Sequence, residues 1–211
     1  MKGYIGKKFE MEVMGKDVNW KKIMKPFPRR KIVLPNGDEM IVRSITVDEV
    51  EKVAEALHPK CLVHRDLFDM ITHELCMELY LWKIERPMWG CMPESHYCLV
   101  GEVGDEIVGA ANGALSSPEV GNSLHTVATK EGLQVGAQLW ASKMEHYFDV
   151  LGVKEVHAAA ESARGGAELF RAFGFEVHPD KVCHFGTSPM QRLTKRQWDR
   201  IRPGKIAGKR I

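Results

Sequence analysis

The chain has 211 residues, of which 44% are hydrophobic and 27% are charged, and its formal net charge is +2. It has only 19 glycines and 10 prolines, and no apolar run approaches the roughly 20 residues that cross a bilayer, so collagen-like, disordered and membrane-spanning classes are excluded. The charge is uneven, because residues 1–30 carry +6 and residues 192–211 carry +7, which leaves −11 on residues 31–191.

The N-terminal part of the chain is predicted to be a basic extension followed by a hairpin. Residues 1–30 are rich in lysine and contain two prolines that forbid a continuous helix. Residues 31–43 hold Asn36-Gly37 between two apolar runs. Asn-Gly favours a two-residue type I′ turn, which needs a positive φ at both central residues. We therefore expect a tight β-hairpin here.

Two helices are expected next. Thr46 and Glu49 form a capping-box pattern, and apolar residues follow at helical spacing. A longer helix is predicted over residues 65–85, because its apolar residues recur on one face, and Pro87 ends it.

The second half of the chain mixes strands and helices. Strands are predicted at 97–103, 107–115, 123–129 and 153–161. Helices are predicted from about 137 to 152 and from 164 to 173, and extended chain at 175–178 and 182–193. This order favours an α/β protein with one mixed sheet and helices on its faces. Residues 194–211 are expected to form a basic C-terminal tail.

A glycine-bearing turn between a predicted strand and a predicted helix is the most informative local feature. The turn contains Gly132 and Gly136, whose spacing does not match the dinucleotide fingerprint. The N–H groups in the first turn of a helix have no partner in the helix, and the helix dipole favours an anion there. The turn therefore predicts an anion site, although many such turns bind nothing.

Two motifs together indicate a family. Glu131-Gly-Leu-Gln-Val-Gly136 resembles the CoA pyrophosphate loop, Arg/Gln-x-x-Gly-x-Gly/Ala, of the GNAT superfamily of acyl-CoA-dependent N-acetyltransferases. Residues Ala163 through Phe175 resemble that family's helix Asn-x-x-Ala-x-x-Leu-Tyr-x-x-x-Gly-Phe. The resemblance covers residues 40–193 in matching element order, and residues 31–193 are expected to form the acyltransferase domain.

The resemblance implies direct transfer of an acetyl or other acyl group from acetyl-CoA to an amine of a small molecule or a protein. It implies a mostly antiparallel mixed sheet, splayed around the CoA site, with a backbone N–H near Val127 that polarises the thioester carbonyl. The residues that it assigns to the cofactor are Val127, Thr129, Gly132, Leu133, Gln134, Val135, Gly136, Ala137 and Phe170.

The reaction needs a group that takes a proton from the acceptor ammonium. His125 is the first candidate, because it lies on the strand beside the expected thioester and histidine titrates near neutrality. Glu102, on a neighbouring strand, is the second, and Tyr97 and Glu161 follow. The first two candidates also have a purely structural explanation: a strand histidine is often part of the core, and a strand carboxylate often faces solvent.

The sequence departs from the family pattern at several positions. Phe170 replaces the tyrosine that protonates the CoA sulfur, and Ala163 replaces a pantetheine-binding asparagine. Glu131 replaces the first cation of the loop, next to Lys130, and Gln134 replaces its middle glycine. The alternative function is therefore a catalytically degenerate protein with this fold that binds CoA or another protein.

The cysteines indicate a reducing compartment and no structural metal. The five cysteines contain no C-x-x-C and no zinc spacing, and their number is odd. His73-Glu74 is a near miss for H-E-x-x-H without the second histidine. The start of the chain lacks the apolar core of a secretory signal. We therefore expect a cytoplasmic protein without metal or membrane contact.

The basic ends leave three interpretations open: they bind an anionic ligand, bind a nucleic acid, or pack on the acidic body or a partner subunit. Packing is favoured, because the tail lacks a groove-reading pattern typical of nucleic-acid binding. The Met- and aromatic-rich segment 68–92 is predicted to be core. Part of it is a candidate for an acceptor cleft or a homodimer contact.

Overall fold

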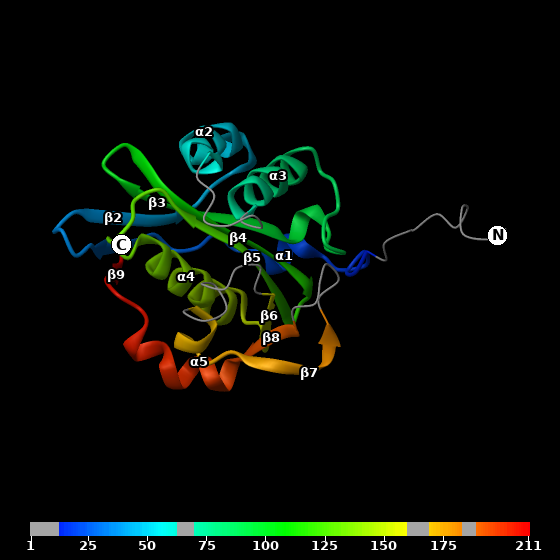
Figure 1. Cartoon of the computed structure of the whole chain (residues 1–211). Helices are drawn as coiled ribbons and strands as arrows, with labels where there is room; N and C mark the ends of the chain where they lie inside the picture. The colour runs from blue at the N-terminus through cyan, green and yellow to red at the C-terminus, as the bar shows by residue number, and fades with distance from the viewer. Residues whose placement is uncertain (1–12, 63–69, 160–168, 183–188) are drawn as a thin grey trace, which may run out of the picture.

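A single mixed β-sheet with helices on both faces forms the body of the protein (Figure 1). The computed structural model describes residues 13–62, 70–159, 169–182 and 189–211. Within these ranges the predicted α/β architecture is confirmed. In Figure 1, α2 and α3 cover one face of the sheet, and α4 and α5 lie against the other.

Neighbouring strands run antiparallel throughout the described sheet, with one exception. The order is β7-β8-β6-β5-β4-β3-β2-β1-β9, and the pair β5–β6 is parallel. The strands are β1 (Arg30–Val33), β2 (Glu39–Ser44), β3 (His96–Val103), β4 (Glu106–Ser117), β5 (Val120–Ala128), β6 (Glu155–Ala158), β7 (Glu176–Val182), β8 (Pro189–Thr194) and β9 (Lys209–Arg210).

The helices differ in length and in the face that they cover. They are α1 (Trp20–Ile23), α2 (Val50–Cys61), α3 (Ile71–Lys83), α4 (Val135–Glu145) and α5 (Lys195–Ile201). A π-helical segment, His146–Leu151, continues α4. The capping box that the sequence predicts is present, with Thr46 and Glu49 bonded reciprocally ahead of α2.

The predicted hairpin is confirmed, but its predicted turn is wrong. Val33 pairs with Glu39, so five residues connect β1 and β2. The N–H of Gly37 donates to the carbonyl of Leu34 (2.9 Å), and in this turn only Gly37 has a positive φ (+91°). Pro35 at the second position and glycine at the fourth are typical of a type I turn. A longer loop with one left-handed glycine therefore replaces the two-residue type I′ turn.

Several predicted boundaries also shift. β5 is longer than its predicted range and begins at Val120, whereas β6 is shorter and ends at Ala158. The basic tail, for which the sequence analysis named no element, contains α5 and β9, and β9 pairs with β1. These elements are stabilised by packing on the body, which sequence periodicity does not report.

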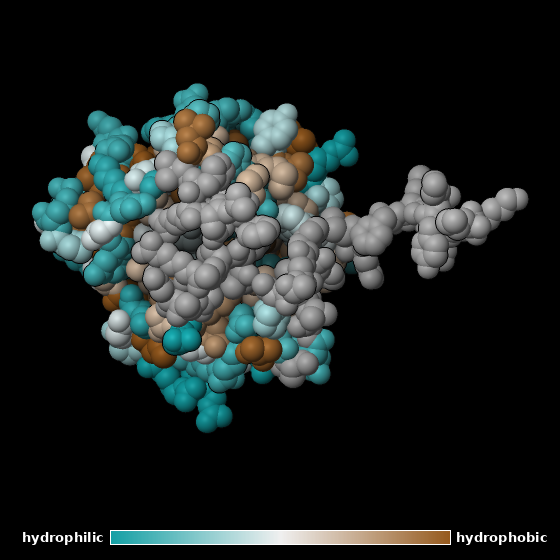
Figure 2. Space-filling model, viewed as in Figure 1, coloured by the Kyte–Doolittle hydropathy of each residue, from teal (hydrophilic) through white to brown (hydrophobic). Residues whose placement is uncertain are grey.

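Each face of the sheet has its own apolar core. The first lies between the sheet and α4, and includes Trp140, Tyr147 and Trp198 of α5. The second lies beneath α2 and α3. In Figure 2, the hydrophobic residues on the visible face form small separate spots on a mainly hydrophilic surface. No helix among the described residues has the length and apolar character needed to span a bilayer.

The basic ends of the described chain pack on its acidic body. Arg30 donates to both carboxylate oxygens of Glu145 (2.9 and 2.6 Å), and both side chains are buried. Arg210 of β9 donates to the same carboxylate (2.8 Å). Arg202 forms an ion pair with Asp149 (2.5 Å). Residues from both ends therefore converge on the last turn of α4 and the segment after it.

Replacing Glu145 with alanine tests this convergence. The change leaves the buried Arg30 guanidinium without a counter-charge, which costs about 3–5 kcal/mol of unfolding free energy. The matched control, Glu39→Ala, removes the exposed partner of Lys31 and is expected to cost less than about 1 kcal/mol. Urea unfolding of both variants measures the difference, and equal losses would contradict the assignment.

His146 gives the fold a defined sensitivity to acid. Its ring packs edge-on against Phe27 and Tyr97, and neither ring nitrogen has a hydrogen-bond partner among the described residues. Burial lowers the pKa of His146 to about 3. The folded state therefore binds fewer protons than the unfolded state between the ordinary pKa of 6.5 and about 3, and stability falls as the pH falls through that window.

Substitution of His146 by phenylalanine removes this proton uptake and keeps an aromatic ring in the core. We expect the midpoint of acid unfolding, followed by circular dichroism, to move to lower pH. His58→Gln, at an exposed position of α2, is the control and is expected to leave the midpoint unchanged. An unshifted midpoint in the His146→Phe protein would show that this ring does not govern acid stability.

Candidate functional site

A β-bulge in β5 is the centre of the candidate site. Ser123 pairs with Gly113 and Thr126 with Ala111, so two residues of β5, Leu124 and His125, stand opposite one residue of β4. That one residue is Asn112. A bulge of this kind bends the strand and redirects a side chain, and bulges are over-represented beside active sites.

The bulge coincides with the point where β5 and β6 separate. Their parallel pairing covers three residues of β5, from Val120 to Asn122, and no described pairing continues beyond it. The N–H groups of His125 and Thr129 point towards β4, where they donate to the Asn112 side chain and the Val108 carbonyl (both 2.9 Å).

The direction of these two N–H groups determines which way the other backbone N–H groups of β5 point. Because the direction alternates along a strand, the N–H of Val127 also faces β4. The N–H groups of Thr126 and Ala128 therefore face the opening between β5 and β6. The sequence places the polarising N–H near Val127, and these are its two neighbours.

His125 is held between two carboxylates of α3. Its Nδ1 lies 2.8 Å from Glu78 Oε2, and its Nε2 lies 3.1 Å from Glu74 Oε2. His125 and Glu78 are buried, whereas the Glu74 side chain is 34% exposed. Carboxylates at both nitrogens stabilise the positive charge that the ring acquires when it takes a proton. The partly exposed Glu74 gives Nε2 a path for proton exchange with solvent.

The partners of Glu78 fix its carboxylate in this position. Asn112 donates from Nδ2 to Glu78 Oε2 (2.7 Å), and the indole N–H of Trp89 donates to the other oxygen. A buried carboxylate with this many donors keeps its orientation. Glu78 and Asn112 were not among the residues predicted from the sequence, and Trp89 was predicted only as part of the Met- and aromatic-rich segment 68–92. The i, i+4 spacing of Glu74 and Glu78 on a helix is the signal that could have found the pair.

Glu102 lies elsewhere. It accepts two hydrogen bonds from the guanidinium of Arg43 (2.8 and 2.7 Å), which also binds Glu49. Glu102 pairs with Ile107 on β4, five residues from Asn112, which is about 16 Å along the strand. The structure therefore does not bring Glu102 to His125. The two carboxylates raise the pKa of Arg43 further above its ordinary value.

Of the remaining base candidates, Tyr97 is buried in the core on the α4 side of the sheet, away from the α3 carboxylates. Burial raises the pKa of its hydroxyl well above the ordinary value. Glu161 lies outside the described residues, as does Ala163.

The predicted anion loop ends at the N-terminus of α4. Gly132 has φ +75°, and Gln134, the residue before the helix, has φ +59°. The N–H of Gln138 makes the first bond of the helix, to Gln134, so the N–H groups of Val135, Gly136 and Ala137 have no partner within α4. Leu133 and Val135 contribute apolar side chains to the core beneath the loop.

Charged residues around this loop are paired. Lys60, at the end of α2, reaches Glu131 (3.1 Å), and Lys130 reaches Glu106 (2.6 Å). The carboxylate of Glu131, which stands where the family pattern has a cation, is thus offset by Lys60. From the sequence, Lys130 was the expected cation to offset the charge of Glu131, but its ammonium pairs with Glu106 instead.

Three polar side chains beside β5 and α4 suit a polar ligand. Thr126 Oγ1, Thr129 Oγ1 and Gln138 Oε1 are buried and have no hydrogen-bond partner among the described residues. Buried polar atoms normally have partners. With the outward N–H groups of β5 and the first turn of α4, these atoms are hydrogen-bonding groups that a polar ligand could use.

Phe170 has a place in the core. Its ring stacks on Phe175 (5.0 Å between centroids) and contacts Trp140 of α4 (5.7 Å). It carries no hydroxyl and is 6% exposed. In this position Phe170 supplies an apolar wall and no proton.

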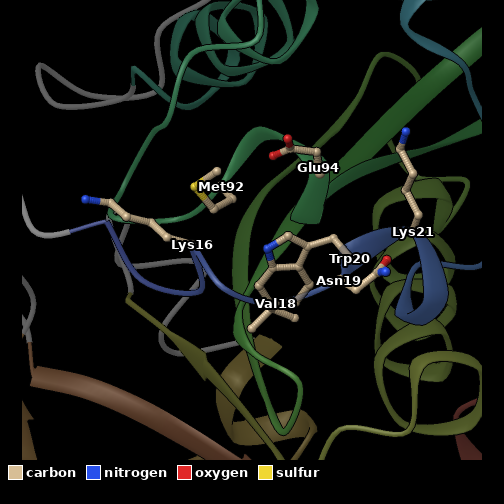
Figure 3. Close-up of a pocket in the computed structure, with 7 residues that line it drawn as sticks. All are labelled: Lys16, Val18, Asn19, Trp20, Lys21, Met92 and Glu94. Carbon is tan, nitrogen blue, oxygen red and sulfur yellow. The ribbon is translucent and has the colours of Figure 1, made fainter.

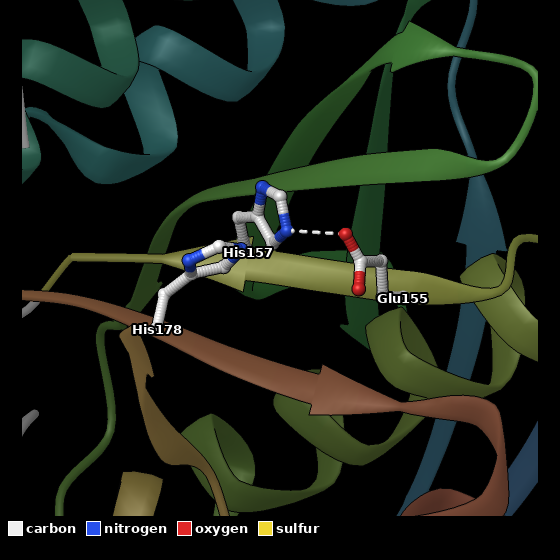
Figure 4. A group of neighbouring side chains, drawn as sticks. All are labelled: Glu155, His157 and His178. Carbon is white, nitrogen blue, oxygen red and sulfur yellow. Dashed lines mark hydrogen bonds and ion pairs between the residues drawn. The ribbon is translucent and has the colours of Figure 1, made fainter. Parts of the chain in front are cut away.

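A second polar cluster contains two residues of β6 and one of β7 (Figure 4). Ligand-type atoms of Glu155, His157 and His178 lie within 4.8 Å of one another, and His157 Nε2 is 2.8 Å from Glu155 Oε1. The N–H of Asp180 donates to His178 Nδ1 (3.1 Å), which leaves the ring proton of a neutral His178 on Nε2. A metal-binding histidine normally donates from its second nitrogen. The hydrogen bonding of His178 therefore does not suit a metal ligand.

A shallow hollow of about 190 Å³ lies near α1, lined by Lys16, Val18, Asn19, Trp20, Lys21, Met92 and Glu94 (Figure 3). These side chains come from the N-terminal segment and from the residues before β3. None of them is part of the His125 network, and the hollow adds no chemical group to it.

The fold is that of GNAT acetyltransferases. No protein-family model matches the sequence, and no curated protein matches it. Among solved structures, the chain is similar to the aminoglycoside acetyltransferase AAC(6')-Ib in complex with coenzyme A and kanamycin, with TM-score 0.54 and 17% identity over 77% of this chain and 99% of that one. It is also similar to Mycobacterium smegmatis RimJ in complex with CoA-disulfide, with TM-score 0.56 and 9% identity over 88% and 100% of the chains. The fold expected from the two sequence motifs is confirmed.

Gln134 gives a test of the loop geometry. A residue with a side chain at φ +59° is strained, and Gln134→Gly removes that strain. Glycine also gives the unfolded chain more conformational entropy, which offsets part of the gain. We therefore expect a net rise in the unfolding free energy of about 0.5–1 kcal/mol. Gly132→Ala, at φ +75°, is the matched opposite change and is expected to lower stability by about 1 kcal/mol. Chemical denaturation measures both, and a destabilised Gln134→Gly protein would refute this loop conformation.

Proposed function

We propose that the protein transfers an acetyl or related acyl group from acetyl-CoA to an amine, by direct attack within a ternary complex. The observation that carries the proposal is the bulge, which puts His125, bonded to Glu78, at the point where β5 and β6 separate. The GNAT fold and the CoA-containing neighbours give independent support.

The chain offers CoA a continuous set of contacts. The pyrophosphate would lie on the N–H groups of Val135, Gly136 and Ala137, where the helix dipole favours negative charge. The amides of the pantetheine arm would bond to the exposed edge of β5, and the outward N–H groups of Thr126 and Ala128 would lie beside the thioester carbonyl. Acetyl-CoA supplies the activated acyl group, and no residue of the protein needs to carry it.

His125 would act as the general base. An ammonium must lose a proton before its nitrogen can attack, and His125 Nε2 would accept that proton. Glu78 is a positioning residue, because it holds Nδ1 and stabilises the charged ring. Glu74, partly exposed at Nε2, would pass the proton to solvent.

The same carboxylates favour a cationic acceptor. Glu74 and Glu78 put negative charge beside His125, and residues 31–191 carry −11 overall. A negative site raises the local concentration of cations. The proposed acceptor is therefore a small molecule or protein whose amine is protonated in solution.

The thiols suit a reducing compartment, and we propose the cytoplasm. Cys61, Cys76, Cys91 and Cys98 are free. Burial raises the pKa of Cys76 and Cys91 to about 11 and that of Cys98 to about 12, so these thiols stay protonated and unreactive near neutral pH.

A second candidate function is CoA binding without catalysis. The observation that favours it is Phe170, which is fixed in the aromatic core and cannot protonate a departing thiolate. In the catalytic proposal that proton comes from water. Acetyl-CoA titration together with thiol release over a panel of amines separates the two functions, because a non-catalytic protein binds acetyl-CoA and releases no thiol with any amine.

His125→Gln tests the catalytic proposal. Glutamine keeps a polar side chain of similar size but cannot take the proton, so we expect the transfer rate to fall at least about 100-fold. The dissociation constant for acetyl-CoA, measured by calorimetry, is expected to change less than about threefold. Glu102→Gln is the matched control on another strand and is expected to keep the rate. No binding by the unaltered protein at millimolar acetyl-CoA would reject both functions, and an unchanged rate in His125→Gln would remove His125 as base.

A further inference from the structure

A lysine lies in the core directly behind the bulge. Lys143 belongs to α4 and is 0% exposed. Its Nζ donates to the carbonyl oxygens of His125 (3.1 Å), Leu124 (3.2 Å) and, at the longest distance, Asn112 (3.4 Å). These carbonyls belong to the three residues that form the bulge. The Nζ also lies 4.5 Å from the ring centroid of Trp140.

The number of donors matches the number of acceptors. A bulge disrupts the sheet ladder, and carbonyl groups that lose their strand partner inside a core are costly unless another donor reaches them. A lysine ammonium has three N–H groups. Burying an ammonium is itself unfavourable, so an apolar residue would be the ordinary choice for this position on α4. The three carbonyls explain why a lysine is tolerated there.

We propose that Lys143 is a positioning residue that holds the β5 bulge in its open form and so directs His125 towards Glu78. This inference rests on the proposed function, since the bulge positions the base. Among the described residues, the contacts of Lys143 Nζ are with the three bulge carbonyls and the ring of Trp140, and not with a side chain of the His125 network. It acts through His125 and through the separation of β5 from β6.

The position of Lys143 also connects both halves of the site. α4 begins at the loop proposed for the pyrophosphate, and Lys143 lies in the same helix at the bulge. The hydrogen bonds from Lys143 therefore hold the bulge at a set distance from the N-terminus of α4. In the proposal, the acyl group lies at the bulge and the pyrophosphate at that N-terminus. Loss of these bonds is expected to weaken both CoA affinity and catalysis.

Burial and two groups across the sheet act on the ammonium. Burial lowers the pKa of Lys143 to about 7, and Glu78 of α3 opposes that shift. The Cys98 thiol of β3 also acts on it, and its ionised form would likewise favour the ammonium, whereas Lys143 reaches His125 at the backbone carbonyl and not at the ring. The folded protein thus binds fewer protons than the unfolded chain between about pH 7 and the ordinary pKa of 10.5, and its stability rises with pH across that window.

Amide hydrogen exchange of His125 tests the proposal directly. This N–H donates to the Asn112 side chain only while the bulge keeps its shape. In Lys143→Met we expect its exchange rate to rise at least tenfold, with acetyl-CoA affinity and transfer rate both reduced at least tenfold. Lys143→Gln, which keeps two donors, is expected to recover part of the protection. Met144→Leu, buried at the next position of α4, is the control and is expected to keep all three properties.

A measurement on the unaltered protein covers the case in which both lysine variants fail to fold. The carbonyl ¹³C shifts of Leu124 and His125 should titrate with the same midpoint as the Lys143 side chain, near pH 7. Separate midpoints, or a folded Lys143→Met protein with normal His125 protection, would overturn the proposal. If the unaltered protein binds no acetyl-CoA, the proposed function fails, whereas the exchange and titration results still decide the role of Lys143.

Discussion

The bulge in β5 is the constraint on which the rest of the site depends. Because Leu124 and His125 together oppose Asn112, the strand bends and stops running alongside β6. The same extra residue turns the His125 ring towards α3, and it leaves N–H groups on the outer edge of β5 without a strand partner. The proposed proton acceptor, the proposed ligand opening and the free edge of β5 thus follow from one local irregularity.

Charged side chains of opposite sign hold this irregularity from the two faces of the sheet. Glu78 reaches it from α3 and Lys143 from α4, and both are fully buried. Such residues cost free energy in a core unless every polar atom finds a partner. Here Glu78 meets His125, Asn112 and Trp89, and Lys143 meets the three bulge carbonyls. Two of the buried charged residues of the described core therefore lie at the site of the proposed chemistry.

The basic ends serve a different purpose. Arg30 and Arg210 bind one buried carboxylate at the last turn of α4, and β9 completes the sheet edge at β1. The near-neutral net charge of the chain is thus the sum of an acidic fold and of basic segments that pack on it. This packing anchors the C-terminal end of α4, and the pyrophosphate is proposed to lie at the N-terminal end of the same helix.

What the sequence determined by itself is mostly local. The capping box at Thr46, the hairpin, the turn at Gly132 and the position of His125 on a strand all follow from short-range chemistry, and the two motifs predicted the fold. The hairpin turn was predicted wrongly because register, and not the Asn-Gly pair, decided the loop length.

The tertiary structure alone decided which residues meet. Glu78 and His125 are 47 residues apart, and Lys143 reaches the bulge from the opposite side of the sheet. Glu102 was a reasonable candidate until the register placed it beside Arg43. A bulge changes strand register by one residue without a sequence signature of its own, because the energy that maintains it comes from distant side chains. Periodicity and propensity report each residue's own backbone preference, and they contain no information about partners supplied by other elements.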